Sequence, residues 1–93
     1  MALFDLLGRR WSLGVLWQLC DKGPTTFRGL QDRCGNVSPT VLNKRLKELR
    51  HVGLIDHGAD GYQATALGRE LFGMLAPMRA WSRQWAKSLE HQG

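Results

Sequence analysis

The chain has 93 residues and a net charge of +5, with 43% hydrophobic and 23% charged residues, so we expect one small folded domain and not a disordered segment. No apolar run approaches the roughly 18 residues of a membrane span. The N-terminal segment also lacks the charged start and cleavage site of a signal peptide, so we expect a cytoplasmic protein with no membrane partner. The basic charge favours nucleic acid as the partner.

The chain begins with two helical segments. Residues 2–8, ALFDLLG, read as a short helix that ends near Gly8. Residues 12–21 read as a second helix, for which we expect Ser12 to be the N-cap because its hydroxyl can accept a backbone hydrogen bond. The apolar residues of this helix recur at helical spacing and are Leu13, Leu16, Trp17 and Cys20. Residues 22–24, KGP, then break the helix.

A third helix is predicted at residues 26–34, with Thr25 or Thr26 as its cap. Its inward-facing residues, by their spacing, are Phe27, Leu30 and Cys34. A turn at residues 35–37 follows and begins with glycine. Two helices joined by a short glycine-containing turn are typical of a helix-turn-helix.

The fourth helix, at residues 39–52, has the clearest start signal. Ser38 supplies a capping hydroxyl, and Pro39 stands at the first helical position, where its missing N–H costs nothing. Gly53 supplies the stop. With residues placed about 100° apart, Leu42, Leu46 and Leu49 fall on one side. The opposite side holds Thr40, Asn43, Lys44, Lys47, Arg50 and His51.

This second side is basic and carries no acid, whereas solvated helix faces usually mix charges. We therefore interpret it as a DNA-binding face that enters the major groove. Thr40 and Asn43 suit base edges, since asparagine can pair with adenine and a threonine methyl can contact thymine. Lys44, Lys47 and Arg50 suit phosphates, and Lys44 could also reach a guanine. The full candidate DNA-binding set is Arg28, Ser38, Thr40, Asn43, Lys44, Lys47, Arg50 and His51.

Two arginines have other interpretations. Arg28, early in the third helix, is either a contact to the DNA backbone or a plain exposed arginine. Arg45 points toward the apolar side of its helix, so we expect a structural role, reaching an acid such as Asp32.

The C-terminal part of the chain reads as a hairpin and a long helix. Residues 54–65 form two short strands, with Gly58 and Gly61 bracketing the turn. This wing is poor in positive charge, which leaves open whether it contacts DNA. The helix after Thr65 contains Pro77, which should kink it or split it in two.

The long helix carries an apolar stripe too extensive for one small domain to cover, and bare tryptophans are unusual on a soluble surface. We expect a homodimer interface, which would hold two recognition helices about 34 Å apart on a palindrome. The alternatives are a helix that folds back on its own domain at Pro77 and a lipid-facing stripe. The candidate interface residues are Leu3, Phe4, Leu71, Met74, Met78, Trp81, Trp85 and Leu89.

The element order predicts a mainly α fold: a winged helix-turn-helix with a short two-stranded wing and a long C-terminal helix. We expect residues 1–93 to form one such domain, with dimerisation helices at both ends. The chain also resembles the HxlR-type winged helix-turn-helix regulators, a bacterial group related to the MarR regulators, over about residues 5–85. The residues that carry the resemblance are Gly8, Arg10, Trp11, Phe27, Ser38, Pro39, Gly53, Leu54, Tyr62, Thr65, Leu67 and Gly68.

The resemblance implies a sequence-specific DNA-binding transcriptional regulator that acts as a homodimer. Some members of that family sense redox signals or aldehydes through a cysteine in a longer N-terminal arm. Residues 1–7 hold no cysteine, so the resemblance does not bring that chemistry to this chain. The family's wing is also usually longer and more basic than the one predicted here.

Other functions have less support. The three histidines, His51, His57 and His91, have no triad-like partners and are too scattered for a metal site, so we expect no enzyme, metal or cofactor. The main alternative is a winged-helix module whose basic face docks on an acidic protein. Cys34 is a candidate redox residue, but no nearby feature clearly activates it. The sequence identifies no small-molecule effector.

Overall fold

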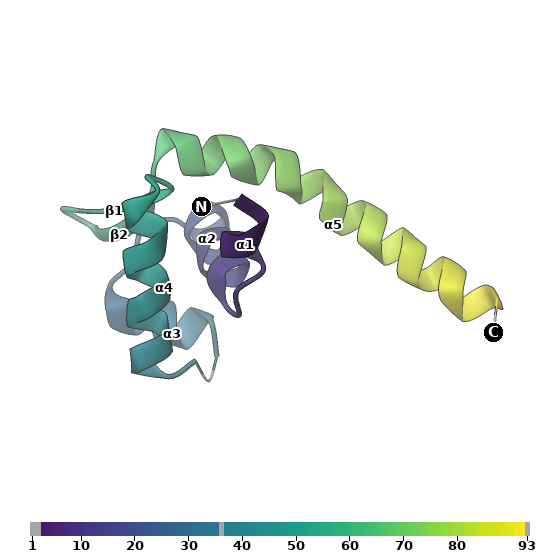
Figure 1. Ribbon diagram of the computed structural model, residues 1–93, viewed down its shortest axis with the longest axis horizontal. Helices are drawn as coiled ribbons and strands as arrows, with labels where there is room; N and C mark the ends of the chain where they lie inside the picture. Colours follow the sequence, from purple (N-terminus) through teal and green to yellow (C-terminus); the bar gives the residue numbers. More distant parts are fainter. Residues whose placement is uncertain (1–2, 36, 93) are drawn as a thin grey trace.

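The computed structural model describes residues 3–35 and 37–92. Helices α1 to α4 and a hairpin gather at one end of the molecule, and the last helix extends away from them (Figure 1). The elements in chain order are α1 (Leu3–Leu7), α2 (Ser12–Lys22), α3 (Phe27–Arg33), α4 (Pro39–His51), β1 (Ile55–Gly58), β2 (Gly61–Ala64) and α5 (Ala66–Gln92). The expected fold class is therefore confirmed. Ala2, at the expected start of the first helix, and Asn36, in the expected turn, lie outside the described residues.

The core is formed by apolar side chains from every helix except the last, together with the two strands. From α4 it takes Leu42, Leu46 and Leu49, as the sequence pattern predicted. The remaining buried hydrophobic residues are Leu6, Val15, Leu16, Leu19, Leu30, Val37, Leu54, Ile55 and Ala64. Helix α5 covers this core through its first turns, where Leu71 packs against it.

The start of α2 differs from the expectation. Ser12 is not the N-cap: it is the first helical residue, and its side chain is buried in the core. The cap position belongs to Trp11, which adopts a left-handed backbone with φ of 77° and makes no side-chain capping bond. The buried face of α2 is formed by Val15, Leu16 and Leu19, whereas Leu13 is exposed and Trp17 packs edge-on against Phe72 of α5.

The helix-turn-helix is held by the caps that the sequence predicted. Thr26 Oγ1 accepts a hydrogen bond from Gly29 N at 3.1 Å, which identifies Thr26 rather than Thr25 as the cap of α3. Ser38 Oγ accepts one from Val41 N at 3.2 Å. Across the turn, Gln31 Nε2 donates to the carbonyl oxygen of Val37 at 3.3 Å. The two capping bonds each stay within their own helix, and the Gln31 bond ties α3 to the residue before the cap of α4.

The wing is a two-stranded antiparallel hairpin, with Ile55 paired to Ala64 and Gly58 to Gly61. Tyr62 also bridges to Thr25, exchanging two backbone hydrogen bonds of 3.1 and 2.8 Å with it. Gly61 has φ of 102°, and a Cβ there would collide with the carbonyl oxygen of Thr25. Glycine is required at this position, because the wing lies directly against the segment before α3.

A charged cluster joins the N-terminal segment to the back of α4. Glu48 forms ion pairs with Arg9 and Arg45, each at 2.7 Å, and its side chain is 14% exposed. Arg45 Nε also donates to the carbonyl oxygen of Arg10 at 2.8 Å. The structural role expected for Arg45 is confirmed, but its expected partner Asp32 is wrong, because Glu48 lies three residues along the same helix.

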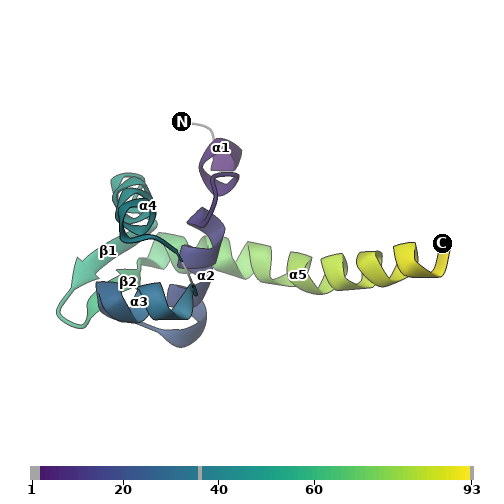
Figure 2. The ribbon, with the colours of Figure 1, turned by 90° about the horizontal axis from the view of Figure 1, so that it is seen from below.

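Pro77 does not split the last helix. Helix α5 runs unbroken from Ala66 to Gln92 and bends along its length in Figure 1. It does not fold back either, since both views show its C-terminal half extending beyond the other elements (Figure 2). Within residues 3–35 and 37–92, no helix combines the length and the apolar character needed to cross a membrane.

Prediction for Glu48. Burial raises the pKa of Glu48, but the hydrogen bond from Arg9 and the charges of Arg45, Arg9 and Lys44 outweigh it, so the pKa lies below its usual value. A lowered pKa in the folded state stabilises the fold above pH ~4.3, the usual pKa of a glutamate, and this stabilisation is lost as the pH falls through the lowered pKa. We expect Glu48→Gln to reduce the free energy of unfolding by about 1–3 kcal/mol at pH 7 and by much less at pH 3.

Urea denaturation followed by circular dichroism measures both values. Glu90→Gln, which removes an exposed carboxylate from α5, is the matched control and should change stability little at either pH. An equal loss for Glu48→Gln at pH 7 and pH 3 would show that the ion pairs do not stabilise the fold.

Candidate nucleic-acid interface

Helices α3 and α4 have the arrangement of a helix-turn-helix. In Figure 2, α4 is seen nearly end-on, while α3 lies apart from it and is seen from the side. The first helix of such a pair commonly crosses the DNA backbone, and the second presents its outer face to the major groove. The residues of interest are therefore those on the outer face of α4 and at the start of α3.

The outer face of α4 is formed by the residues that the helical wheel predicted. All six are exposed to solvent, while Leu42, Leu46 and Leu49 are buried on the opposite side. These six are Thr40, Asn43, Lys44, Lys47, Arg50 and His51. The structure thus brings the predicted base-seeking and phosphate-seeking side chains onto one surface.

The charges of α4 are separated between its two sides. Glu48 is the acid of the helix, and it is turned away from the outer face toward Arg9 and Arg45. No ion pair involves Lys44, Lys47 or Arg50 among the described residues. The outer face therefore presents three cations to solvent without a neutralising carboxylate, which suits a polyanion.

Ser38 and Arg28 are the two candidate DNA-binding residues that lie outside α4. The Ser38 hydroxyl oxygen accepts the capping hydrogen bond from Val41 N, but its O–H remains able to donate to a phosphate. Arg28, in the first turn of α3, is exposed and belongs to no ion pair in the described part of the chain. Ser38 is therefore at the N-terminal end of α4, and Arg28 is at the N-terminal end of α3.

The wing contributes little positive charge. Residues 55–64 contain Asp56 and Asp60 and no lysine or arginine. The His57 ring packs on Tyr62, with ring centroids 4.5 Å apart. A phosphate backbone near the wing tip would meet the Asp60 carboxylate, so the electrostatic attraction comes from α4 and not from the hairpin.

The candidate interface residues at the two ends of the chain are mostly exposed. Phe4 of α1 is 83% exposed, and Leu3 beside it is also exposed. On α5, Leu71 is the exception, because it is partly buried against the core. The other candidate interface residues on α5 are exposed, and they are Met74, Met78, Trp81, Trp85 and Leu89.

Several residues that position this surface were not predicted. Arg9 is one, since its ion pair with Glu48 depends on the path of the chain before α2. Arg33 is another: it donates to the carbonyl oxygen of Gly23 at 2.7 Å and so ties α3 to the end of α2. These contacts join residues far apart in the sequence, so the spacing of residue types carried no signal for them.

The cysteines are not activated. Burial raises the pKa of the Cys34 thiol, and the Arg33 charge lowers it by less, so the pKa lies above its usual value. Cys20 behaves in the same way, with Arg69 as its positive neighbour. No group of three or more metal-ligating side chains occurs in the part of the chain that the structure describes.

Comparison with known proteins gives consistent results. Residues 6–90 match the HxlR-like helix-turn-helix family. The HTH-type transcriptional regulator YodB of Bacillus subtilis (strain 168) is 29% identical over 93 residues, covering 92% of this chain and 82% of that protein. The crystal structure of quinone-bound YodB aligns with a TM-score of 0.80 and 32% identity, covering 87% of this chain and 91% of that one.

A possible HxlR family transcriptional factor from Thermoplasma volcanium GSS1 has the same fold. Its crystal structure aligns with a TM-score of 0.80 at 20% identity, covering 94% of this chain and 84% of that one.

Prediction for Cys34. Because its thiol has a raised pKa, little of the reactive thiolate is present at neutral pH. We expect Cys34→Ser to leave DNA affinity unchanged, with and without hydrogen peroxide, in a fluorescence-anisotropy titration. A loss of binding under peroxide that occurs in the parent chain and is absent in Cys34→Ser would show instead that Cys34 is a redox switch.

Proposed function

The chain belongs to the HxlR-like helix-turn-helix family of transcriptional regulators, and we propose that it binds a palindromic DNA site as a homodimer, with α4 of each copy in the major groove. The observation that carries this proposal is the acid-free basic outer face of α4, the second helix of the helix-turn-helix.

The side chains on this face divide by position into two roles. Thr40 and Asn43 lie in the first part of α4, the part that contacts base edges in helix-turn-helix proteins. Lys44, Lys47 and Arg50 continue along the helix and reach phosphates on either side of the groove. Arg28 and the Ser38 hydroxyl add contacts to the backbone. Specificity would then rest mainly on the first residues of the helix and affinity on the later ones.

The homodimer is supported by the C-terminal half of α5. This half extends beyond the domain and carries Trp81 and Trp85, which are 63% and 52% exposed. Their rings stack with centroids 6.1 Å apart, which leaves an ordered apolar surface facing solvent. A second copy would cover this surface with the same one of its own, as a two-fold interface requires. One recognition helix reads few base pairs, so two are needed for useful specificity.

Prediction for the outer face of α4. Lys47→Ala should weaken binding to all duplexes and reduce the slope of log affinity against log salt by about one unit, because one phosphate contact is lost. Asn43→Ala should instead cost roughly 1–3 kcal/mol at one base position and relax the preference there. Sites selected from random DNA, titrated at several salt concentrations, measure both effects.

Lys87→Ala is the matched control, since it removes the same charge from α5, outside this surface. If Lys47→Ala and Asn43→Ala bind every duplex like the parent, α4 is not the recognition helix. If the basic face binds an acidic protein and excess non-specific duplex DNA does not displace it, the chain is a protein-docking module.

Prediction for the C-terminal stripe. We expect the parent chain to sediment as a dimer at micromolar concentration. Trp81→Glu with Trp85→Glu should give a monomer with weakened operator binding, because four carboxylates cannot be buried without partners in one small interface.

Gln84→Glu with Lys87→Glu adds two acids to α5 away from the stripe and should remain dimeric. Sedimentation equilibrium makes the comparison. A folded, monodisperse monomer for the parent chain would contradict the homodimer and the palindromic site.

A further inference from the structure

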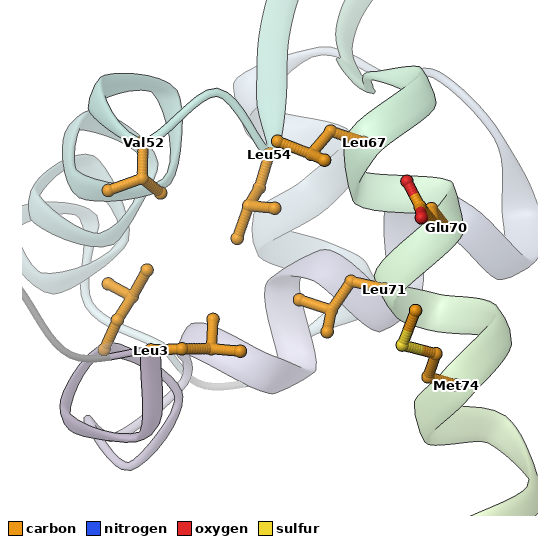
Figure 3. Close-up of a pocket in the computed structure, with 8 residues that line it drawn as sticks. Leu3, Val52, Leu54, Leu67, Glu70, Leu71 and Met74 are labelled. Atoms are coloured by element: carbon orange, nitrogen blue, oxygen red, sulfur yellow. The ribbon is translucent and has the colours of Figure 1, made fainter.

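An apolar cavity lies where α1, the end of α4 and the start of α5 meet. Its volume is about 400 Å³. Leu3 of α1, Val52 at the end of α4 and Leu54 just before the wing line one part of it. Figure 3 shows these side chains directed toward the same space as Leu67, Leu71 and Met74 of α5. Glu70 is the charged member of the lining and is itself exposed.

The α5 wall of this cavity is the first part of the exposed stripe. The stripe continues at spacings of three and four residues, so it stays on one side of the helix. Its exposed members are between 49% and 63% accessible to solvent. In order, the stripe consists of Leu67, Leu71, Met74, Met78, Trp81, Trp85 and Leu89. The cavity lies at the first end of the stripe, and the two large tryptophans lie toward its projecting end.

This arrangement is complementary to itself. When two such helices pair antiparallel about a two-fold axis at Met78, the full length of both stripes overlaps. Leu67 then faces the other chain's Leu89, and Leu71 faces its Trp85, since Met78 lies midway between the members of each pair. In a parallel pair, each cavity would face the other cavity and each Trp85 the other Trp85, so the cavities would stay empty.

We propose that the cavity between α1, α4 and α5 receives the side chain of Trp85, with Leu89 at its outer edge, from α5 of a second copy of this chain. The proposal rests on the homodimer proposed above and specifies its pairing. A tryptophan can bury roughly 150–250 Å². Trp81 and Trp85 are already partly covered within their own chain, so each can bury only part of this area on pairing. Together they supply on the order of a third of the ~800 Å² that each partner buries in a stable interface.

This pairing gives the cavity a role in DNA binding. Val52 and Leu54 flank Gly53, where α4 ends in a left-handed residue with φ of 79° and the wing begins. A tryptophan from the second copy would pack against the end of the recognition helix. The orientation of α4 in each copy would then depend on the presence of the other, so a monomer would bind even a half-site poorly.

Site-specific crosslinking tests the pairing. In a chain carrying Cys20→Ala and Cys34→Ser, Leu67→Cys and Leu89→Cys are introduced together, which leaves Trp85 in place. The two positions lie about 33 Å apart along one helix, whereas a disulfide needs Cα atoms within roughly 7 Å. Any disulfide between them must therefore join two chains. On oxidation we expect a covalent dimer on a non-reducing gel, and monomer for each single cysteine variant.

Each outcome has one meaning. A covalent dimer from either single variant indicates a parallel pair and overturns the proposal. A chain that sediments as a dimer but forms no crosslink between positions 67 and 89 also overturns it, while the homodimer stands. A monomer in sedimentation overturns the homodimer itself and this pairing with it.

A size exchange provides a second measurement that needs no cysteine. Leu71→Trp fills the cavity from within and should weaken dimerisation about 30-fold or more, as expected for the loss of an interface hot spot. Adding Trp85→Ala to Leu71→Trp should restore most of the loss, because the space is exchanged between the chains. Leu75→Trp with Trp85→Ala is the control, since Leu75 lines a different groove, between α2 and α5. Equal dimer affinity for the two double variants would overturn the proposal.

Discussion

The ion pairs of Glu48 attach α4 to the rest of the domain and leave its outer face basic. The carboxylate holds Arg9 on one side and Arg45 on the other, and Arg45 also holds the carbonyl oxygen of Arg10. This cluster fixes the back of α4 to the segment between α1 and α2. It also removes the acid of α4 from the outer face, so that the cations left there have no neutralising partner. The same contact therefore serves both the fold and the sign of the surface.

The position of α4 depends on elements at both ends of the chain. Its back contacts the N-terminal segment through Glu48, and its end lies beside α1 and α5 at Val52 and Leu54. Helix α1 and the projecting half of α5 are also the parts with the most exposed apolar side chains. Contacts made with another molecule at the cavity lined by Leu3, Val52 and Leu71 would bear directly on the end of α4. In a domain this small, the proposed homodimer and the proposed DNA-binding face would share the same supports.

The sequence predicted those features that depend on neighbouring residues. Ser38 and Pro39 mark the start of α4 because capping is decided within one turn, and Leu42, Leu46 and Leu49 reveal the buried face because burial follows the helical period. Ser12 was misassigned because the adjacent Trp11 takes a left-handed conformation, with Arg10 over its ring at 5.5 Å, and local preferences disfavour that state.

Contacts between residues far apart in the sequence were not predicted, because residue spacing reports only on neighbours. The partner of Arg45 and the bridge from Thr25 to Tyr62 follow from the packing of whole elements. Pro77 was expected to kink or split α5; the helix is not split, and it runs through Pro77 from Ala66 to Gln92 and bends along its length. The outer face of α4 could be predicted from residue spacing alone, because every residue on it belongs to one helix.

The charge distribution itself argues that recognition needs two copies. On the proposed interface, one chain offers Lys44, Lys47 and Arg50 of α4 and Arg28 of α3, and the wing adds no lysine or arginine. Each neutralised phosphate contributes a slope of about 0.9 in log affinity against log salt, so three or four contacts give a monomer only weak binding at physiological ionic strength. Two copies on one site double the number of contacts while the translational cost of binding is met once. A longer basic wing would supply that attraction within one chain. In the proposed homodimer, the attraction that the short acidic hairpin lacks would come from α4 of the second copy, which would make the exposed stripe of α5 as necessary to DNA binding as α4.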